Sequence, residues 1–234
     1  MYHGITSQDS KIPSDREFGA ELYDLPVEQF RAQLEYLKRS DIKAVITFDD
    51  GEINNYELGL PILQELGFKA YFFIIVKRIG REGYMGFPEL KALLLAGMTI
   101  GSHGLTHEVL TNLQDSLIIE ELRASKQCLE VNLGIPINAF SVPRGFCNDK
   151  IIQMADNAGY TQLFVSEWPK DSKSICTSRI AVKSNWTLKR FQQALEGHTP
   201  LVEKLGDICK NTAKIVLRES GYNFLRRILI YILK

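Results

Sequence analysis

Short apolar runs alternate along this chain with segments in which apolar residues recur every three to four positions. The runs predict strands at residues 2–5, 44–48, 71–76, 98–100, 139–142, 162–165 and 175–182. The periodic segments predict helices at residues 27–39, 56–66, 88–96, 115–132, 149–158 and 188–195. Strands that alternate with helices are typical of a parallel sheet, so the pattern predicts an α/β fold.

The alternation stops near residue 200, which divides the chain into a domain at 1–199 and a C-terminal extension at 200–234. The sequence of the extension predicts two helices, at residues 201–219 and 222–233, separated at Ser220-Gly221. The second is apolar with few cations. We expect it to pack on the main domain or on a second subunit, and peripheral membrane contact is the alternative. It is too short to span a bilayer.

Composition narrows the classes of function. Lys and Arg together number 28, as do Asp and Glu, so no overall charge favours nucleic acid as a partner. The four cysteines form no Cys-x-x-Cys pair, which indicates neither a zinc ribbon nor a disulfide scaffold and suits a reducing compartment. No secretory signal is visible at the start, so we expect a cytoplasmic protein, and no apolar run predicts a transmembrane span.

Candidate chemistry lies where two predicted strands end. Asp49 and Asp50 follow the run at 44–48, and His103 and His107 follow the run at 98–100. The carboxyl ends of parallel strands meet at one edge of a sheet, so these side chains are expected to converge. One Asp and two His would give three ligands and leave a position open, as in a catalytic zinc-type site. The alternative is a plain turn in which Asp50 or Asn54 caps the next helix.

Three stretches carry a family resemblance: Ile46 to Gly51, Ser102 to His107, and Phe140 to Gly145. Over about residues 1–195 the chain resembles the polysaccharide deacetylases of the NodB-homology type, carbohydrate esterase family 4. Residues 1–5 are similar to the opening strand of exopolysaccharide-linked members. The resemblance implies an irregular (β/α) barrel, a deformed TIM barrel, here with a C-terminal helical extension.

The resemblance also implies roles for single residues. Asp50, His103 and His107 would hold a divalent metal, zinc or else cobalt or nickel. Asp49 would be the general base that activates water at the metal. The backbone N–H of Arg144 would stabilise the oxyanion, while its side chain would orient substrate or lie in solvent.

The function implied is metal-dependent hydrolysis of a non-peptide carbon–nitrogen bond. The substrate class would be an N-acetylated amino sugar in an oligo- or polysaccharide. Two alternatives stay open: amide hydrolysis of a small non-sugar metabolite, and a metal-binding, catalytically weak protein that binds glycans.

Two departures from the family pattern motivate the last alternative. Ser141 stands where the third motif usually has an Arg that pairs with the catalytic Asp, and Arg144 and Arg179 are candidate replacements by charge alone. No His lies between His107 and His198, so the usual late proton donor is missing. His3 is a candidate acid, or alternatively a hydrogen-bonded histidine at the barrel mouth. Trp168 could line a sugar subsite or cover the core.

Overall fold

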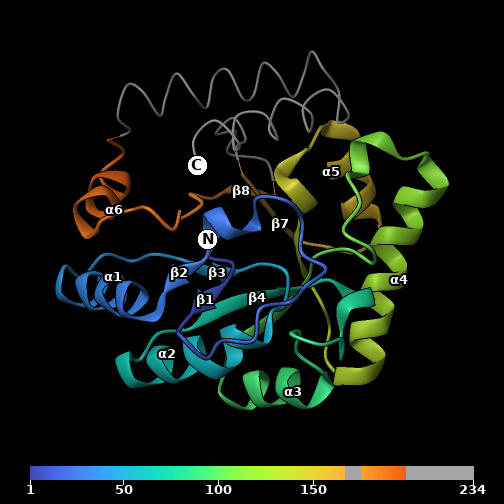
Figure 1. The fold of residues 1–234 in the computed structure, drawn as a ribbon. Coiled ribbons are helices and arrows are strands. Elements are labelled where there is room, and N and C mark those ends of the chain that lie inside the picture. Colours follow the sequence, from blue (N-terminus) through green and yellow to red (C-terminus); the bar gives the residue numbers. More distant parts are fainter. Residues whose placement is uncertain (167–174, 199–234) are drawn as a thin grey trace.

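The computed structural model describes residues 1–166 and 175–198. Six parallel strands form one sheet in which each strand lies beside its successor in the sequence, and the sheet curls with helices on its outside (Figure 1). The strands are β3 Ile46–Phe48, β4 Ala70–Ile74, β5 Thr99–Ser102, β6 Ala139–Ser141, β7 Gln162–Val165 and β8 Cys176–Ser178. The predicted α/β barrel is confirmed. Trp168 and the extension at 200–234 lie outside the described residues.

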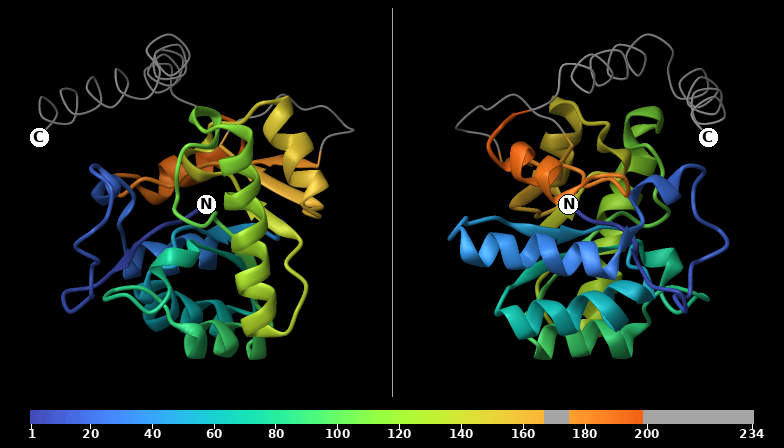
Figure 2. Two further views of the ribbon diagram at one scale, coloured as in Figure 1. Left: turned by 90° about the vertical axis from the view of Figure 1, so that its right-hand side faces the viewer. Right: turned by 60° about the vertical axis from the view of Figure 1, so that its left-hand side comes forward.

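The helices follow the predicted order and pack around the sheet, as two further views show (Figure 2). Their bounds are α1 Val27–Arg39, α2 Leu60–Leu66, α3 Phe87–Leu95, α4 Asp115–Leu133, α5 Asp149–Asn157 and α6 Leu188–Leu195. The prediction of one α-helix over 56–66 was wrong, because Asn55–Gly59 forms a π-helical turn. The side-chain amide of Asn55 (Nδ2) in this turn donates to the backbone carbonyl of His3 at 2.6 Å, which fixes the turn to the N-terminal segment of the chain.

Several predicted strands are too long. Strand β3 begins at Ile46 and β8 ends at Ser178, because each pairs only where its neighbour runs alongside. The predicted strand at 2–5 is also displaced: β1 is Ile5–Thr6, and it pairs with a short strand that the pattern did not predict, β2 Leu25–Pro26. Residue 2 instead forms a single parallel bridge to Phe48.

Met1 and Tyr2 connect the two edges of the curled sheet. The amide of Tyr2 donates to the carbonyl of Thr47 at 2.8 Å, and that of Asp49 donates back to the carbonyl of Tyr2 at 3.1 Å. On the other side, the amide of Val182 donates to the carbonyl of Met1 at 3.0 Å. These bonds join β3 to the segment after β8, so the ring of strands closes near their carboxyl ends.

Aromatic side chains fill the interior of the barrel beneath that closure. Phe73, Ala139 and Phe164, from three different strands, form a small buried cluster of their own. Gly101 makes room for it, since a Cβ atom at this position would lie 2.4 Å from the Phe73 ring. The larger core lies between sheet and helices, and there Phe48 stacks on Phe72 with centroids 4.8 Å apart.

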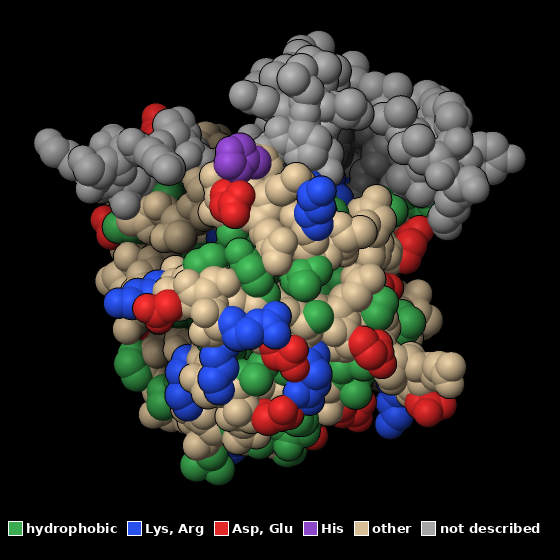
Figure 3. Space-filling model, turned by 90° about the vertical axis from the view of Figure 1, so that its left-hand side faces the viewer, with side chains coloured by type: hydrophobic (Ala, Val, Ile, Leu, Met, Phe, Trp, Pro, Cys, Tyr) green, Lys and Arg blue, Asp and Glu red, His purple; other side chains and the backbone are tan. Residues whose placement is uncertain are grey.

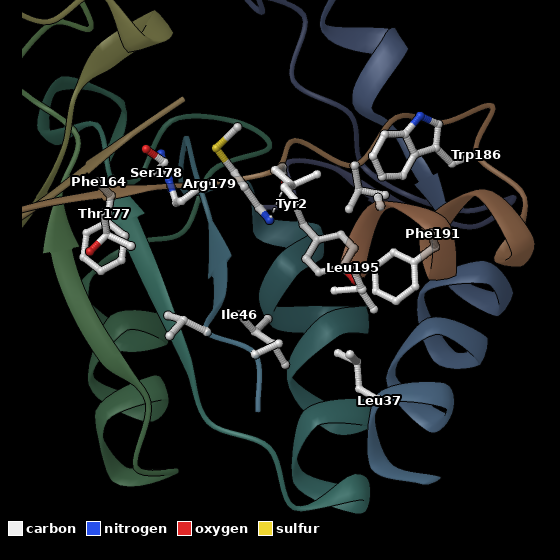
Figure 4. A pocket seen from close by; sticks show the side chains of 16 residues that line it. Tyr2, Leu37, Ile46, Phe164, Thr177, Ser178, Arg179, Trp186, Phe191 and Leu195 are labelled. Carbon is white, nitrogen blue, oxygen red and sulfur yellow. Dashed lines mark hydrogen bonds between the residues drawn. The ribbon is translucent and has the colours of Figure 1, made fainter. Parts of the chain in front are cut away.

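A groove remains open below the closure, between β3 and α6. Its volume is about 270 Å³, and Figure 4 shows Ile46, Trp186 and Phe191 facing into it, with Arg179 at one end. On the face that carries α1 and α6, hydrophobic side chains lie among charged ones (Figure 3). Among the described residues, no helix is both long and apolar enough to cross a membrane.

Candidate active site

The predicted site residues converge at the carboxyl ends of the barrel strands. Asp49 and Asp50 follow β3, and His103 follows β5 directly. Four non-glycine residues of the described chain have positive φ, and three of these are site candidates: Asp50 at 74°, His107 at 73° and Arg144 at 57°. Such backbone is uncommon for non-glycine residues and collects at functional sites, where the surrounding structure holds it.

Three side chains form a candidate metal site. The Nε2 atoms of His103 and His107 lie 3.5 and 3.6 Å from Oδ1 of Asp50. In a tetrahedral zinc site with bonds of about 2.0–2.1 Å, neighbouring ligand atoms are about 3.3 Å apart. Oδ1 of Asp50 is buried and accepts no hydrogen bond from the described residues. An orphaned carboxylate oxygen facing two imidazole nitrogens therefore fits a cation.

Hydrogen bonds orient both imidazole rings toward that point. Nδ1 of His103 lies 2.7 Å from the carbonyl oxygen of Ser141, and Nδ1 of His107 lies 2.6 Å from Oε1 of Glu17. Both acceptors require a proton on Nδ1, so in the neutral ring Nε2 is the atom that offers a lone pair to a metal. Burial lowers the pKa of His103 to about 4, which keeps this ring neutral at physiological pH.

Asp49 lies beside the metal site but has different partners. Arg179, one residue beyond β8, donates to both of its oxygens at 2.7 and 2.9 Å. The hydroxyl of Ser141 donates to Oδ2 at 3.0 Å and itself lies 2.7 Å from Arg179. Burial alone would raise the pKa of Asp49, but the charge of Arg179 holds it well below its ordinary value. Asp49 is therefore held ionised and in a fixed orientation beside the candidate metal site.

His3 lies near both carboxylates. Its Nδ1 is buried without a hydrogen-bond partner among the described residues, and its ring packs against Tyr23 with centroids 4.9 Å apart. Burial lowers the pKa of His3, and the charges of Asp50 and Asp49 oppose that effect. The structure thus gives no bond to Nδ1 of the kind expected for a histidine with only a structural role.

Arg144 is held at the other side of the site. Its Nε lies 3.3 Å from Oε2 of Glu17, so one carboxylate contacts both Arg144 and His107. Burial would raise the pKa of Glu17, but the hydrogen bond and charge of His107, with Arg144, lower it to about 2. The predicted residues Asp49, Asp50, His3, His103, His107 and Arg144 are thus brought together.

Comparison with known proteins identifies the family of this chain. A family model described as polysaccharide deacetylase matches residues 26–163. The chain belongs to the polysaccharide deacetylase family. It is 30% identical over 209 residues to YxkH of Bacillus subtilis, provisionally named a polysaccharide deacetylase, covering 84% of this chain and 75% of that protein. It is 29% identical over 186 residues to a peptidoglycan-N-acetylglucosamine deacetylase of Bacillus cereus, covering 76% and 83%.

A solved structure agrees on the fold of this deacetylase. The Streptococcus pyogenes deacetylase PplD, in complex with acetate, superposes with a TM-score of 0.71 at 20% identity. The match covers 85% of this chain and 96% of PplD. The family's deformed barrel is therefore confirmed for the described residues.

In this deacetylase, Arg179 takes the place of the arginine missing from the third motif. The sequence offered Arg144 and Arg179 as equal candidates by charge. The structure selects Arg179, since it contacts Asp49 directly while Arg144 pairs with Glu17. Arg179 also lies over the interior rings of Phe73 and Phe164, 5.4 and 5.6 Å from their centroids. The barrel cluster thus supports the cation that holds Asp49.

Two acidic residues of the site escaped the sequence interpretation. Glu17 lies in a polar loop with no motif, ninety positions from its partner His107. Glu121 of α4 accepts hydrogen bonds from the amides of Leu105 and Thr106 at 2.7 and 3.0 Å, and so holds the loop between the two histidines. A signal for Glu121 exists only in hindsight: it is the one charged residue on the buried face of α4, where its neighbours are Ile118, Leu122, Ser125 and Leu129.

Proposed function

We propose that this chain is a zinc-dependent hydrolase that removes N-acetyl groups from the amino sugars of an oligo- or polysaccharide. One observation carries the proposal: Oδ1 of Asp50 faces the Nε2 atoms of His103 and His107, with ionised Asp49 beside them. Two nitrogens and one oxygen suit zinc, and cobalt or nickel would be accepted by the same donors.

A bound zinc ion would supply Lewis acidity and water activated near neutral pH. Asp49 accepts the proton that the water loses as it attacks the amide carbon. Its pairing with Arg179 keeps it charged, and the hydroxyl of Ser141 keeps it aimed. The backbone turn at Arg144 offers its N–H to the developing oxyanion, as the family motif implies.

His3 is the proposed proton donor to the leaving amine; because burial lowers its pKa, the ring has to take up a proton before it can donate one. An amine leaves poorly unless it is protonated, and a positioned acid typically contributes about 10²–10⁴-fold to the rate. The barrel brings His3 to the same edge as Asp49, because Tyr2 bridges to Phe48 at the end of β3. The products are acetate and a free amino sugar. In this proposal His3 fills the role of the missing late histidine.

The name of the Bacillus cereus relative supports N-acetylglucosamine as the sugar. The test is acetate release from N-acetylglucosamine oligomers by zinc-loaded wild type, with Asp49→Asn as the matched inactive control. Metal content is measured in parallel for wild type, His103→Ala and His107→Ala. We expect near-stoichiometric zinc in wild type alone, and acetate release above that of Asp49→Asn. A wild type that takes up no zinc, cobalt or nickel would refute the proposal.

A further inference from the structure

We infer that Glu17 is a positioning residue of the active site, which holds the metal ligand His107 and the oxyanion turn at Arg144 through one carboxylate. The inference rests on the proposed function. None of the three motif stretches of the chain contains this residue, which lies in the loop between β1 and β2.

The contact to His107 sets how that ring meets a metal. Oε1 of Glu17 lies 2.6 Å from Nδ1, and the imidazole is largely buried, with 8% of its side chain exposed. A carboxylate at this distance keeps the proton on Nδ1 and leaves Nε2 to face Asp50, 3.6 Å away. His107 also has a left-handed backbone at φ 73°, a conformation that the surrounding structure must hold in a non-glycine residue. The contact to Glu17 is one of the restraints on this residue.

The second oxygen reaches a different element. Oε2 of Glu17 lies 3.3 Å from Nε of Arg144, whose backbone is left-handed at φ 57°. Arg144 stands between Pro143 and Gly145, in the turn that follows β6. Because one carboxylate binds both groups, the distance between the metal ligand and the oxyanion turn is set by Glu17.

A purely structural role makes a different prediction. If Glu17 only anchored its loop, its removal would lower the stability of the fold and leave metal affinity unchanged in the folded protein. A positioning role predicts weaker metal binding in the folded protein, in addition to the stability that the two lost contacts contribute. Outer partners of metal-bound histidines are typically worth about 10–100-fold in metal affinity or activity.

The first experiment compares wild type, Glu17→Ala and Glu17→Gln in the full chain. Zinc affinity is measured by competition with a chromophoric chelator, and unfolding by urea is measured in excess chelator. We expect zinc affinity 10–100-fold weaker in Glu17→Ala and an intermediate loss in Glu17→Gln, whose amide oxygen still accepts from Nδ1. Glu120→Gln, at an exposed glutamate of α4, is the control and should match wild type.

A spectroscopic readout reports the orientation itself. The ¹⁵N shifts of the His107 ring in zinc-free protein at pH 8.5 distinguish a proton on Nδ1 from one on Nε2. We expect the Nδ1–H form to dominate in wild type and a mixture of both forms in Glu17→Ala. Unchanged tautomer and unchanged zinc affinity in Glu17→Ala would overturn the inference.

The contact between Glu17 and Arg144 is tested by a double-mutant cycle of Glu17→Ala and Arg144→Ala, with acetate release at saturating zinc as the readout. If Glu17 positions the turn through Arg144, the loss of kcat caused by Glu17→Ala is smaller in the Arg144→Ala background. Equal losses in both backgrounds would refute this part of the inference. These outcomes differ from failure of the proposed function, in which wild type itself would bind no metal or release no acetate.

Discussion

The pairing of Arg179 with Asp49 yields the sharpest quantitative prediction. Arg179→Met removes the cation and keeps a chain of similar length over the rings of Phe73 and Phe164. The side chains of Arg179 and Asp49 are 6% and 4% exposed, so the variant would leave the Asp49 carboxylate buried and without its arginine. Two unit charges about 4 Å apart attract with about 4 kcal/mol at an effective dielectric constant of about 20. Breaking a buried pair from one side typically costs about 3–5 kcal/mol.

We therefore expect Arg179→Met to lower the free energy of unfolding by about 3–4 kcal/mol at pH 7. In wild type the Asp49 pKa is lowered, so the ionised carboxylate contributes fully to stability above the ordinary carboxyl pKa. This contribution is lost progressively as pH falls below that value toward the lower pKa of the folded state. In the variant the largest cause that lowers this pKa is gone, so burial should raise it, and stability should instead fall as pH rises. The acidic limb of the pH profile of kcat/KM should move to higher pH, because the base must be unprotonated.

The assay is urea unfolding in excess chelator at pH 5.5 and pH 7.5, so that metal affinity does not contribute. Arg179→Met, Asp49→Asn and the double variant form one cycle. The double variant should lose less than the sum of the single variants, by about 2–3 kcal/mol, since no unpaired charge remains. Arg81→Met is the control, because Arg81 forms a surface pair with Asp15 at 3.4 Å and its side chain is 57% exposed. Additive losses, or an unmoved acidic limb, would show that Arg179 does not hold Asp49 as argued.

Three further predictions concern other residues. Burial raises the pKa of Glu52 to about 7, so wild type should lose up to about 3 kcal/mol of stability as pH rises from 4.5 to 7. In urea unfolding, Glu52→Gln should show a weaker dependence of stability on pH. An unchanged pH dependence in this variant would contradict the prediction. Gly101→Ala should lower Tm by an amount equivalent to about 1–3 kcal/mol, because the added Cβ would lie 2.4 Å from the Phe73 ring. Gly59→Ala should leave Tm unchanged, because the nearest atom to its Cβ would be 3.5 Å away. Equal Tm values for the two variants would count against close packing inside the barrel. His3→Gln should keep the zinc content of wild type, while the rate of deacetylation falls by about 10²–10³-fold. Hydrolysis of 4-nitrophenyl acetate should fall much less, because its leaving group needs no proton. Equal losses on the two substrates would exclude His3 as the acid.

The sequence by itself determined the order of the elements and which residues are candidate metal ligands. Helices over 27–39 and 188–195 appear with the predicted bounds, because their apolar positions recur at helical spacing and pack on the sheet. The ligands were predictable for a topological reason. Asp50 and His103 each follow a short apolar strand, and parallel strands in sequential order bring their carboxyl ends together.

The partners of those ligands were decided by the tertiary structure alone. Arg179 contacts Asp49 across 130 positions, and Glu17 contacts His107 across 90. Nothing local marks either residue, because a charge in a loop has the same sequence signature whether it is solvated or buried against a distant partner. The closure by Met1 and Tyr2, which sets His3 beside the site, likewise depends on backbone hydrogen bonds to β3 and to the segment after β8, which are far apart in the chain. Local periodicity predicts which face of an element is buried, whereas the choice between two loop arginines is made only when the barrel closes around one of them.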